Sequence, residues 1–213
     1  EVDERRIDEL AAEVARFHGR IDVAPPGSPY GEAKDALALA LDNIDALLAA
    51  PPDPAIAGTL DTLRRWTERT FASIQSRLEA RRHEGFVREC HGDLHLGNIA
   101  VVDGRIAIFD CIDFNARMRW NDLMGEVAFL AMDLEYRGRA DLADRFVNRY
   151  MEATGDYAGA AVLRFFVVYR AMVRAKVEAL RVAQMPDGAE RASLATECRE
   201  YVALARAWAA PPH

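Results

Sequence analysis

Apolar residues recur at spacings of three and four over most of this chain, which is the period of helices with one buried face. The first such helix is predicted from a cap at Asp3 to about Arg20. A loop over residues 24–29, rich in proline and glycine, ends it. Two antiparallel helices follow, joined by a proline hinge at residues 51–54. Residues 1–85 are therefore predicted to be helical segments that lead into the middle of the chain.

The period of the pattern changes in the middle of the chain. Two short β-prone runs, Ile99 to Val102 and Arg105 to Phe109, flank an Asp-Gly dipeptide. This dipeptide is favoured by the two-residue type I′ turn of a hairpin. Pairing the two runs on either side of the turn places Asn98 opposite Phe109. The sequence thus predicts a small β-hairpin with Asn98 at its open end.

The helical pattern returns after the hairpin. Four further helices are predicted, at residues 123–136, 140–153, 158–184 and 187–208. The longest carries an apolar stripe, which we interpret as core and not as a cofactor site: Val162, Phe165, Phe166, Tyr169, Met172, Val173, Val177 and Leu180. The fold class predicted from these patterns is mainly α, with a small β-hairpin.

Composition narrows the class of protein. The chain has 213 residues, 51% of them hydrophobic, and can bury a sizeable core. Its net charge of -7 argues against a nucleic-acid partner. Apolar runs fall short of the roughly 18 residues that span a membrane, and the three cysteines lack zinc-site spacing. We predict a cytoplasmic protein with no membrane or nucleic-acid partner, and its oligomeric state is left open.

One run carries candidate chemistry: His91 to Asn98, with Asp110 beyond the hairpin. Phosphoryl transfer requires a carboxylate that accepts a hydroxyl proton and oxygen ligands that hold Mg²⁺. Asp93, on the loop before the first strand, is placed to act as this base. Directly opposed strand residues lie about 5 Å apart, so Asn98 and Asp110 meet at the open end of the hairpin. These two residues can therefore share one cation.

This run and its hairpin resemble the catalytic loop and metal-binding segment of the aminoglycoside phosphotransferase and choline kinase group, whose fold is similar to that of protein kinases. The resemblance implies that Asp93 is the catalytic base and that Asn98 and Asp110 are Mg²⁺ ligands. It also implies that Asp122, twelve residues after Asp110, hydrogen-bonds and braces the catalytic loop. His91 is implied to be a structural histidine that packs under the loop.

The resemblance implies an architecture as well. Residues 1–213 would form the large, helical C-terminal lobe of a kinase-like fold. Residues 86–122 would be its catalytic and metal-binding segment, and residues 123–213 a helical subdomain. Two further stretches, residues 15–18 and 109–115, are similar to an uncharacterised bacterial branch of the group.

The group also carries an N-terminal β-sheet lobe, with a loop that covers the nucleotide phosphates and a lysine that pairs with them. The only lysine before Asp93 is Lys34, which lies in a predicted helix. We therefore expect the nucleotide-binding lobe to be absent from this chain, and the chain to be inactive by itself. It begins at Glu1 without an initiator Met, and a fragment, a processed product and a natural truncation remain alternatives.

The activity that the resemblance implies belongs to the full-length protein. It is transfer of the γ-phosphoryl group of ATP or GTP to a hydroxyl group of a small molecule, with Mg²⁺ as cofactor. Its partners would be the nucleotide, the acceptor and the N-terminal lobe. The sequence does not identify the acceptor and does not distinguish ATP from GTP.

Two other classes of function stay open. One is a binding or regulatory module that keeps the kinase-like fold without turnover. The other is a zinc or manganese hydrolase, because His91, Asp93 and His95 share one face of an extended segment. The hydrolase would need a further ligand cluster, and we expect none, because the remaining histidines (His18, His83 and His213) are scattered along the sequence.

Several residues near the site have competing interpretations. Asp113 also precedes a Phe, but the spacings to Asn98 and to Asp122 favour Asp110 as the metal ligand. Asp113 and His95 are then loop residues in the neighbourhood of the metal or substrate. Asp122 can also cap the following helix. For Arg117 and Arg119, a phosphate contact and a solvated charge are evenly matched.

Two further groups are interpreted as having no role in catalysis. Cys90 and Cys111 adjoin the proposed site but are expected to be small buried side chains and not a redox pair. Asp133, Glu135 and Glu178 on the later helices are expected to be solvated charges and not a negative wall for a cationic substrate.

Overall fold

The computed structural model describes residues 3–50 and 53–211. The chain divides into two compact units. The first unit combines the chain up to Glu32 with Ser76–Leu163, and the second combines Ala33–Gln75 with the chain from Arg164 onward. All the candidate catalytic residues fall in the first unit.

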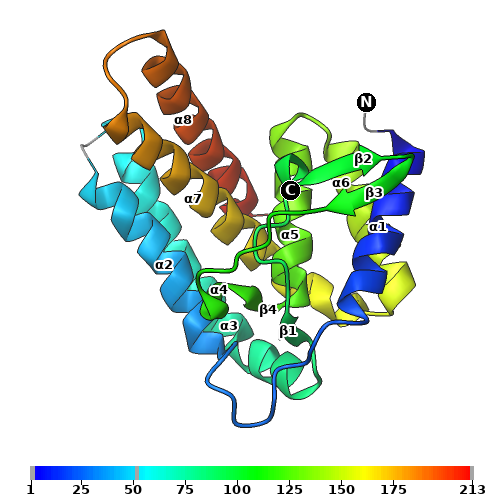
Figure 1. The fold of residues 1–213 in the computed structure, drawn as a ribbon. Helices are drawn as coiled ribbons and strands as arrows, with labels where there is room; N and C mark the ends of the chain where they lie inside the picture. The colour runs from blue at the N-terminus through cyan, green and yellow to red at the C-terminus, as the bar shows by residue number, and fades with distance from the viewer. Residues whose placement is uncertain (1–2, 51–52, 212–213) are drawn as a thin grey trace. The chain divides into compact units, whose positions relative to one another are not determined.

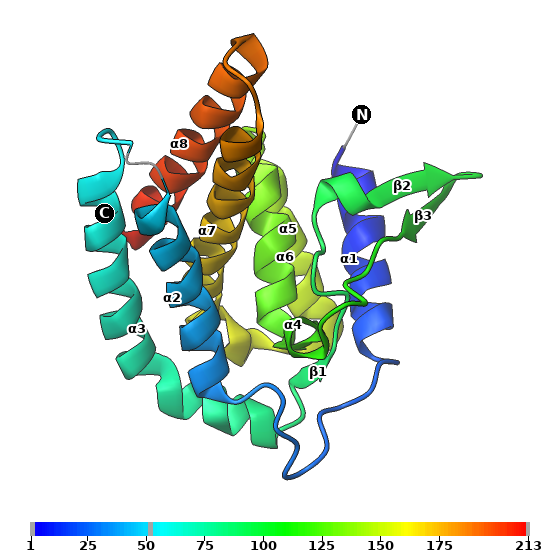
Figure 2. The same ribbon diagram turned by 60° about the vertical axis from the view of Figure 1, so that its left-hand side comes forward.

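The first unit combines helices with two short antiparallel strand pairs (Figure 1). Its elements are α1 (Glu4–His18), the last turns of α3 (Ala57–His83), β1 (Val87–Glu89), the 3-10 turn η1 (Leu96–Asn98), β2 (Ile99–Val102), β3 (Arg105–Ile108), α4 (Ala116–Arg119), β4 (Trp120–Asp122), α5 (Leu123–Tyr136), α6 (Ala140–Thr154), the 3-10 turn η2 (Tyr157–Gly159) and the first turn of α7 (Ala160–Gln184). In both ribbon views α1 lies beside the β2–β3 hairpin (Figure 2).

The helix α1 forms where its sequence predicts. The Asp3 side chain caps it by accepting a hydrogen bond from the Arg6 N–H at 2.8 Å. Its buried face comprises Ile7, Leu10, Ala11, Val14 and His18. This face packs against α6 and the hairpin.

The helix α5 is the centre of the first unit. Every residue from Leu123 to Leu134 is buried. A helix that is apolar on all sides is enclosed by its neighbours, and α5 packs against α6, β4 and η1. Because α5 is enclosed, polar side chains on it can hold the loops around it.

The β2–β3 hairpin has the predicted register. Ile99 pairs with Ile108 and Val102 pairs with Arg105. The turn residues Asp103 and Gly104 have φ angles of 49° and 77°, which a type I′ turn requires. The Phe109 N–H donates to the Asn98 carbonyl at 3.1 Å, so these two residues are opposed as predicted.

A second strand pair, β1–β4, was not predicted. Val87 pairs with Asp122 and Glu89 pairs with Trp120. Its strands of three residues are too short to show alternation of polar and apolar residues. The pairing closes residues 87–122 into one loop that begins and ends at the same place.

The second unit consists of α2 (Ala33–Ala49), most of α3, most of α7 and α8 (Ala189–Ala209). Its core includes the rings of Phe71 and Phe165, whose centroids lie 6.1 Å apart. The predicted proline hinge between α2 and α3 falls partly on residues 51–52, which lie outside the described residues.

The end of the predicted apolar stripe on α7 is wrong. The stripe is buried as far as Met172, but Leu180 is 54% exposed. In the same part of the helix Glu178 is fully buried and pairs with Arg174 at 2.9 Å and Arg181 at 2.8 Å. The prediction that Glu178 is solvated is therefore also wrong, because the two arginines replace water around its carboxylate.

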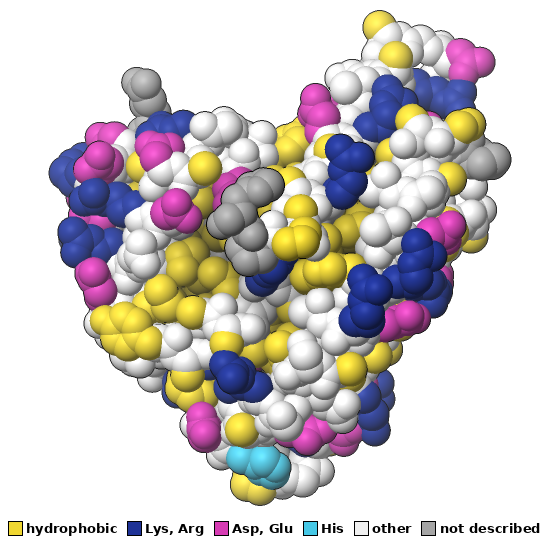
Figure 3. All heavy atoms as spheres, turned by 180° about the vertical axis from the view of Figure 1, so that it is seen from behind, with side chains coloured by type: hydrophobic (Ala, Val, Ile, Leu, Met, Phe, Trp, Pro, Cys, Tyr) yellow, Lys and Arg dark blue, Asp and Glu magenta, His cyan; other side chains and the backbone are white. Residues whose placement is uncertain are grey.

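The mainly α fold is confirmed. No helix of the described part is both long and apolar enough to cross a membrane. On the face drawn in Figure 3, acidic and basic side chains are interspersed, and basic side chains do not gather into an extended patch.

Candidate active site

The candidate catalytic loop turns at Gly92. Its φ angle is 86°, and a Cβ atom there would lie 2.9 Å from the carbonyl oxygen of Met118. Only glycine adopts this conformation without strain and without a clash. The next residue is Asp93, the candidate base.

Asp93 and Asn98 are brought together. The Asn98 amide nitrogen donates to the Asp93 carbonyl at 3.0 Å and to its carboxylate at 3.2 Å. Asn98 is buried, whereas the Asp93 side chain is 36% exposed. Since the Asn98 nitrogen is engaged, its Oδ1 remains as an acceptor for a cation. His95 Nε2 lies 3.4 Å from the Asp93 carboxylate.

Asp110 stands just beyond the open end of the hairpin. It is exposed and has a φ angle of 62°, a conformation uncommon for residues other than glycine. The buried His91 fixes this segment, because its Nε2 bonds the Phe109 carbonyl at 2.7 Å and its own carbonyl accepts from the Ile112 N–H at 3.0 Å. A cavity of about 470 Å³ opens beside Asp110 and His91.

The donor chemistry of this group fits a hard cation. Asn98 offers an amide oxygen, and Asp93 and Asp110 offer carboxylates that keep some exposure to solvent. Mg²⁺ takes oxygen ligands of this kind and few of them from the protein. The residues present are therefore suited to Mg²⁺.

Two acidic residues of α5 hold the loop, and neither was predicted to do so. Glu126 is fully buried and accepts from the backbone N–H groups of His91 at 3.2 Å and Gly92 at 2.7 Å. Asp133, also buried, accepts from the Leu96 N–H at 2.9 Å. The expectation that Asp133 is solvated is wrong, because its carboxylate is used to bind the loop backbone.

The charge of Glu126 is maintained although it is buried. Burial raises the pKa of Glu126, but hydrogen bonds from His18 and from the Gly92 N–H outweigh it and hold the pKa below its usual value. A carboxylate with several donors around it remains ionised. Glu126 is therefore an anion that accepts hydrogen bonds from the loop.

The hydrogen bonds of Asp122 differ from the prediction. Its carboxylate accepts from Arg81 at 2.7 and 2.9 Å and from the Met124 N–H at 2.9 Å, and neither of these donors belongs to the loop. Asp122 thus caps α5, as the alternative interpretation held. Burial raises the pKa of Asp122 more than Arg81 lowers it.

Arg81 is the centre of a buried ionic group. Its guanidinium is 2% exposed and binds both Asp122 and Asp156, the latter at 2.6 and 2.7 Å. It also lies over the Phe86 ring at 4.3 Å. This group joins the end of α3 to the start of α5 and fixes the position of β4, which precedes α5. Asp122 therefore supports the site indirectly.

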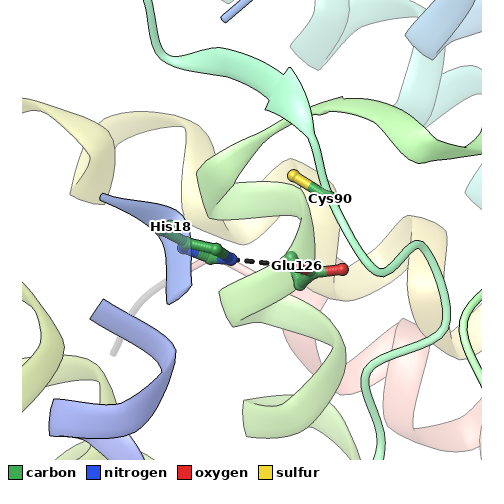
Figure 4. Close-up of side chains that lie close together, drawn as sticks. All are labelled: His18, Cys90 and Glu126. Carbon is green, nitrogen blue, oxygen red and sulfur yellow. Dashed lines mark hydrogen bonds and ion pairs between the residues drawn. The ribbon is translucent and has the colours of Figure 1, made fainter. Parts of the chain in front are cut away.

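His18 was expected to lie in no cluster, and this is wrong. In Figure 4 it lies beside Glu126 and Cys90, and the ligand atoms of the three lie within 4.8 Å of one another. His18 Nε2 is 2.9 Å from Glu126 and its Nδ1 is 2.8 Å from the Tyr150 hydroxyl. The hydrogen-bond partners of His18 are therefore Glu126 and Tyr150, whereas the Cys90 thiol donates to the Asn121 carbonyl at 3.6 Å. His213 lies outside the described residues.

The geometry does not favour the metal hydrolase. Among the residues that the structure describes, His91, Asp93 and His95 do not form a group with ligand distances. Both ring nitrogens of His91 are engaged, Nε2 by the Phe109 carbonyl and Nδ1 by the Asp93 N–H at 3.3 Å. Neither ring nitrogen of His91 is therefore left for a metal.

Three other neighbours take definite places. Arg119 binds Glu89 at 2.9 Å and the carbonyls of Ile112 and Asp113 at 3.1 and 3.2 Å, which tethers the candidate metal-binding segment to β1. Asp113 is exposed on that segment, as is Cys111. Of the two cysteines expected to be buried, only Cys90 is.

The model of the phosphotransferase enzyme family matches residues 1–166. Uncharacterised proteins of Mycobacterium tuberculosis and Mycobacterium bovis are 36% identical over 184 residues, which is 85% of this chain and 36% of theirs. The chain thus spans about a third of the length of these curated relatives.

Two solved structures have a similar fold. Plasmodium vivax ethanolamine kinase has a TM-score of 0.54 and 12% identity, over 93% of this chain and 59% of that chain. Amicoumacin kinase hAmiN, in complex with AMP-PNP, Ca²⁺ and Ami, has a TM-score of 0.54 and 16% identity, over 94% and 59%. At these identities the likeness shows the fold alone.

Proposed function

Since this chain belongs to the phosphotransferase enzyme family, we propose that the full-length protein transfers the γ-phosphoryl group of ATP or GTP to a hydroxyl group of a small molecule. The observation that carries the proposal is the hydrogen bond from Asn98 to the Asp93 carboxylate. Asp110 lies one residue beyond Phe109, which pairs with Asn98 at the open end of the hairpin. These are the three groups that phosphoryl transfer requires.

Each residue has a defined role in this proposal. Asp93 accepts the proton of the acceptor hydroxyl through its exposed carboxylate. Asn98 orients that carboxylate with its amide nitrogen and, with Asp110, provides oxygen ligands for Mg²⁺. When bound, the ion neutralises charge on the nucleotide phosphates. His91 keeps the metal-binding segment against the loop.

The proposal makes the metal ligands testable by nucleotide binding. In the full-length protein, Asp110→Asn and Asn98→Ala should each weaken binding of ATP in the presence of Mg²⁺, because each removes an oxygen ligand or its charge. We expect Asp113→Asn, an exposed aspartate three residues further on, to bind nearly as the native protein does. Isothermal titration of Mg²⁺ and ATP into each variant measures this.

The same titration separates the other classes of function. A non-catalytic module would give no Mg²⁺-dependent nucleotide signal even in the native protein. A loss of signal with Asp113→Asn and not with Asp110→Asn would exchange the roles of these two residues. Tightly held zinc or manganese, found by elemental analysis of the purified protein, would support the hydrolase instead.

A further inference from the structure

A chain of hydrogen bonds runs from α6 through α1 to the catalytic loop. It begins at the Tyr150 hydroxyl, passes through His18 and Glu126, and ends at the backbone N–H groups of His91 and Gly92. The three side chains are at most 1% exposed. Buried polar groups are costly unless each one is satisfied. The proposed chemistry uses none of these three side chains.

The direction of the hydrogen bond between His18 and Glu126 follows from the Glu126 carboxylate. An ionised carboxylate only accepts hydrogen bonds, so His18 donates its Nε2–H to Glu126. His18 Nδ1 lies 2.8 Å from the Tyr150 hydroxyl, as an acceptor in the neutral imidazole or as a donor in the imidazolium. Both ring nitrogens and both Glu126 oxygens are thereby engaged. One orientation of the His18 ring satisfies the whole chain.

His18 is itself held in place. It is the last residue of α1, and its carbonyl accepts from the Arg88 guanidinium on β1 at 2.6 Å. Its ring also makes an edge-on contact with the Tyr150 ring, at 5.5 Å between centroids. A fixed donor at this place selects one rotamer of Glu126. Figure 4 shows the His18 ring directed at that carboxylate.

We propose that His18 is a positioning residue for the catalytic loop. By holding the Glu126 carboxylate it fixes the peptide groups of His91 and Gly92, and so the direction of Asp93. The effect on catalysis rests on the proposed function, whereas the effect on the loop does not. The catalytic loop is thus supported by a helix that precedes it by more than seventy residues.

Hydrogen exchange of the full-length protein tests the structural half of the proposal, which is the effect of His18 on the loop. His18→Leu keeps the volume but removes the donor, and His18→Gln keeps a donor near the place of Nε2. A control, Ile7→Ala, removes a fully buried side chain from the same helix, α1. We expect His18→Leu to speed exchange of a peptide covering residues 90–98 by about tenfold, as for loss of a hydrogen bond to a charged group, and the other two variants to leave it nearly unchanged.

A milder variant, Tyr150→Phe, provides the same test if His18→Leu does not fold. Tyr150→Phe removes only a hydroxyl, and should speed exchange in the same peptide by about threefold. Equal exchange in native protein, His18→Leu and Tyr150→Phe would overturn the proposal, as would equal increases in His18→Leu and Ile7→Ala. Stoichiometric zinc in the native protein that is lost in His18→Leu would also overturn it, because His18 would then be a ligand.

Kinetics test the catalytic half. With a phosphate acceptor in hand, His18→Leu should lower kcat about tenfold with little change in the KM for nucleotide, because a misplaced base slows the chemical step. His18→Gln should restore most of kcat. Absence of phosphoryl transfer by the native protein would count against the proposed function and leave the exchange result standing. Native kcat in His18→Leu, together with altered exchange, would overturn the catalytic half alone.

Discussion

At the scale of single residues, Glu126 and Asp133 hold the loop that carries Asp93. The sequence contains a signal for this role. Both acids stand in the apolar run of α5, where every residue from Leu123 to Leu134 is buried. An acid within a fully buried helix must have donors around it. The resemblance to the phosphotransferase group instead indicated Asp122, because Asp122 stands twelve residues after Asp110, where that group has a further Asp. The identity of the donors depends on tertiary contacts that spacing does not contain.

The charge of Glu126 should make the stability of the protein depend on pH. Its pKa is lower in the folded protein than in the unfolded chain, so its contribution is present above the unfolded value of about 4.3 and is lost as the pH falls through the folded value. Glu126→Gln should lower the free energy of unfolding at pH 7 by about 1.5–3 kcal/mol. Glu126→Gln should also reduce the decrease in the free energy of unfolding as the pH falls.

Chemical unfolding of native protein and Glu126→Gln between pH 7 and pH 3 measures this difference. Asp141→Asn is a suitable control, because the Asp141 side chain is 63% exposed and exposed ion pairs contribute little. A difference between native protein and Glu126→Gln that stays constant over this range would show that the Glu126 charge does not contribute.

At the scale of elements, the hairpin and most helices could be predicted because local chemistry determines them. The Asp-Gly turn sets the register of β2 and β3, and the cap at Asp3 sets the start of α1. The strands β1 and β4 could not be predicted, since three residues carry no period and their pairing joins distant parts of the chain. The helix α4, of four residues, is equally short.

The shape of the candidate catalytic loop depends on Gly92, and a second glycine at positive φ, Gly104, provides a matched comparison. Gly92→Ala and Gly104→Ala both place alanine at a positive φ, which costs about 1–2 kcal/mol. Only at Gly92 would the new Cβ meet backbone, the Met118 carbonyl, because space around Gly104 is open. We expect Gly92→Ala to destabilise the protein clearly more than Gly104→Ala in thermal or chemical unfolding. Equal losses would show that the loop relaxes around the added methyl group.

At the scale of the whole molecule, the sequence predicted the family and the class of fold but not the division into two units. The division occurs within α3 and α7, whose helical period continues across it without a break. A boundary inside a continuous helix leaves no proline or glycine signal. The chain also spans about a third of its curated relatives, so the proposed activity concerns the full-length protein.

Phosphoryl transfer by the full-length protein with Asp93→Asn tests the central claim most directly. The change keeps the size and polarity of the side chain and removes the base. Transfer of labelled γ-phosphate from Mg²⁺-ATP or Mg²⁺-GTP to a small-molecule hydroxyl should fall by about 10²–10⁴-fold, the usual contribution of general base catalysis, while the unfolding midpoint stays near the native value. Transfer at the native rate by Asp93→Asn would contradict the account.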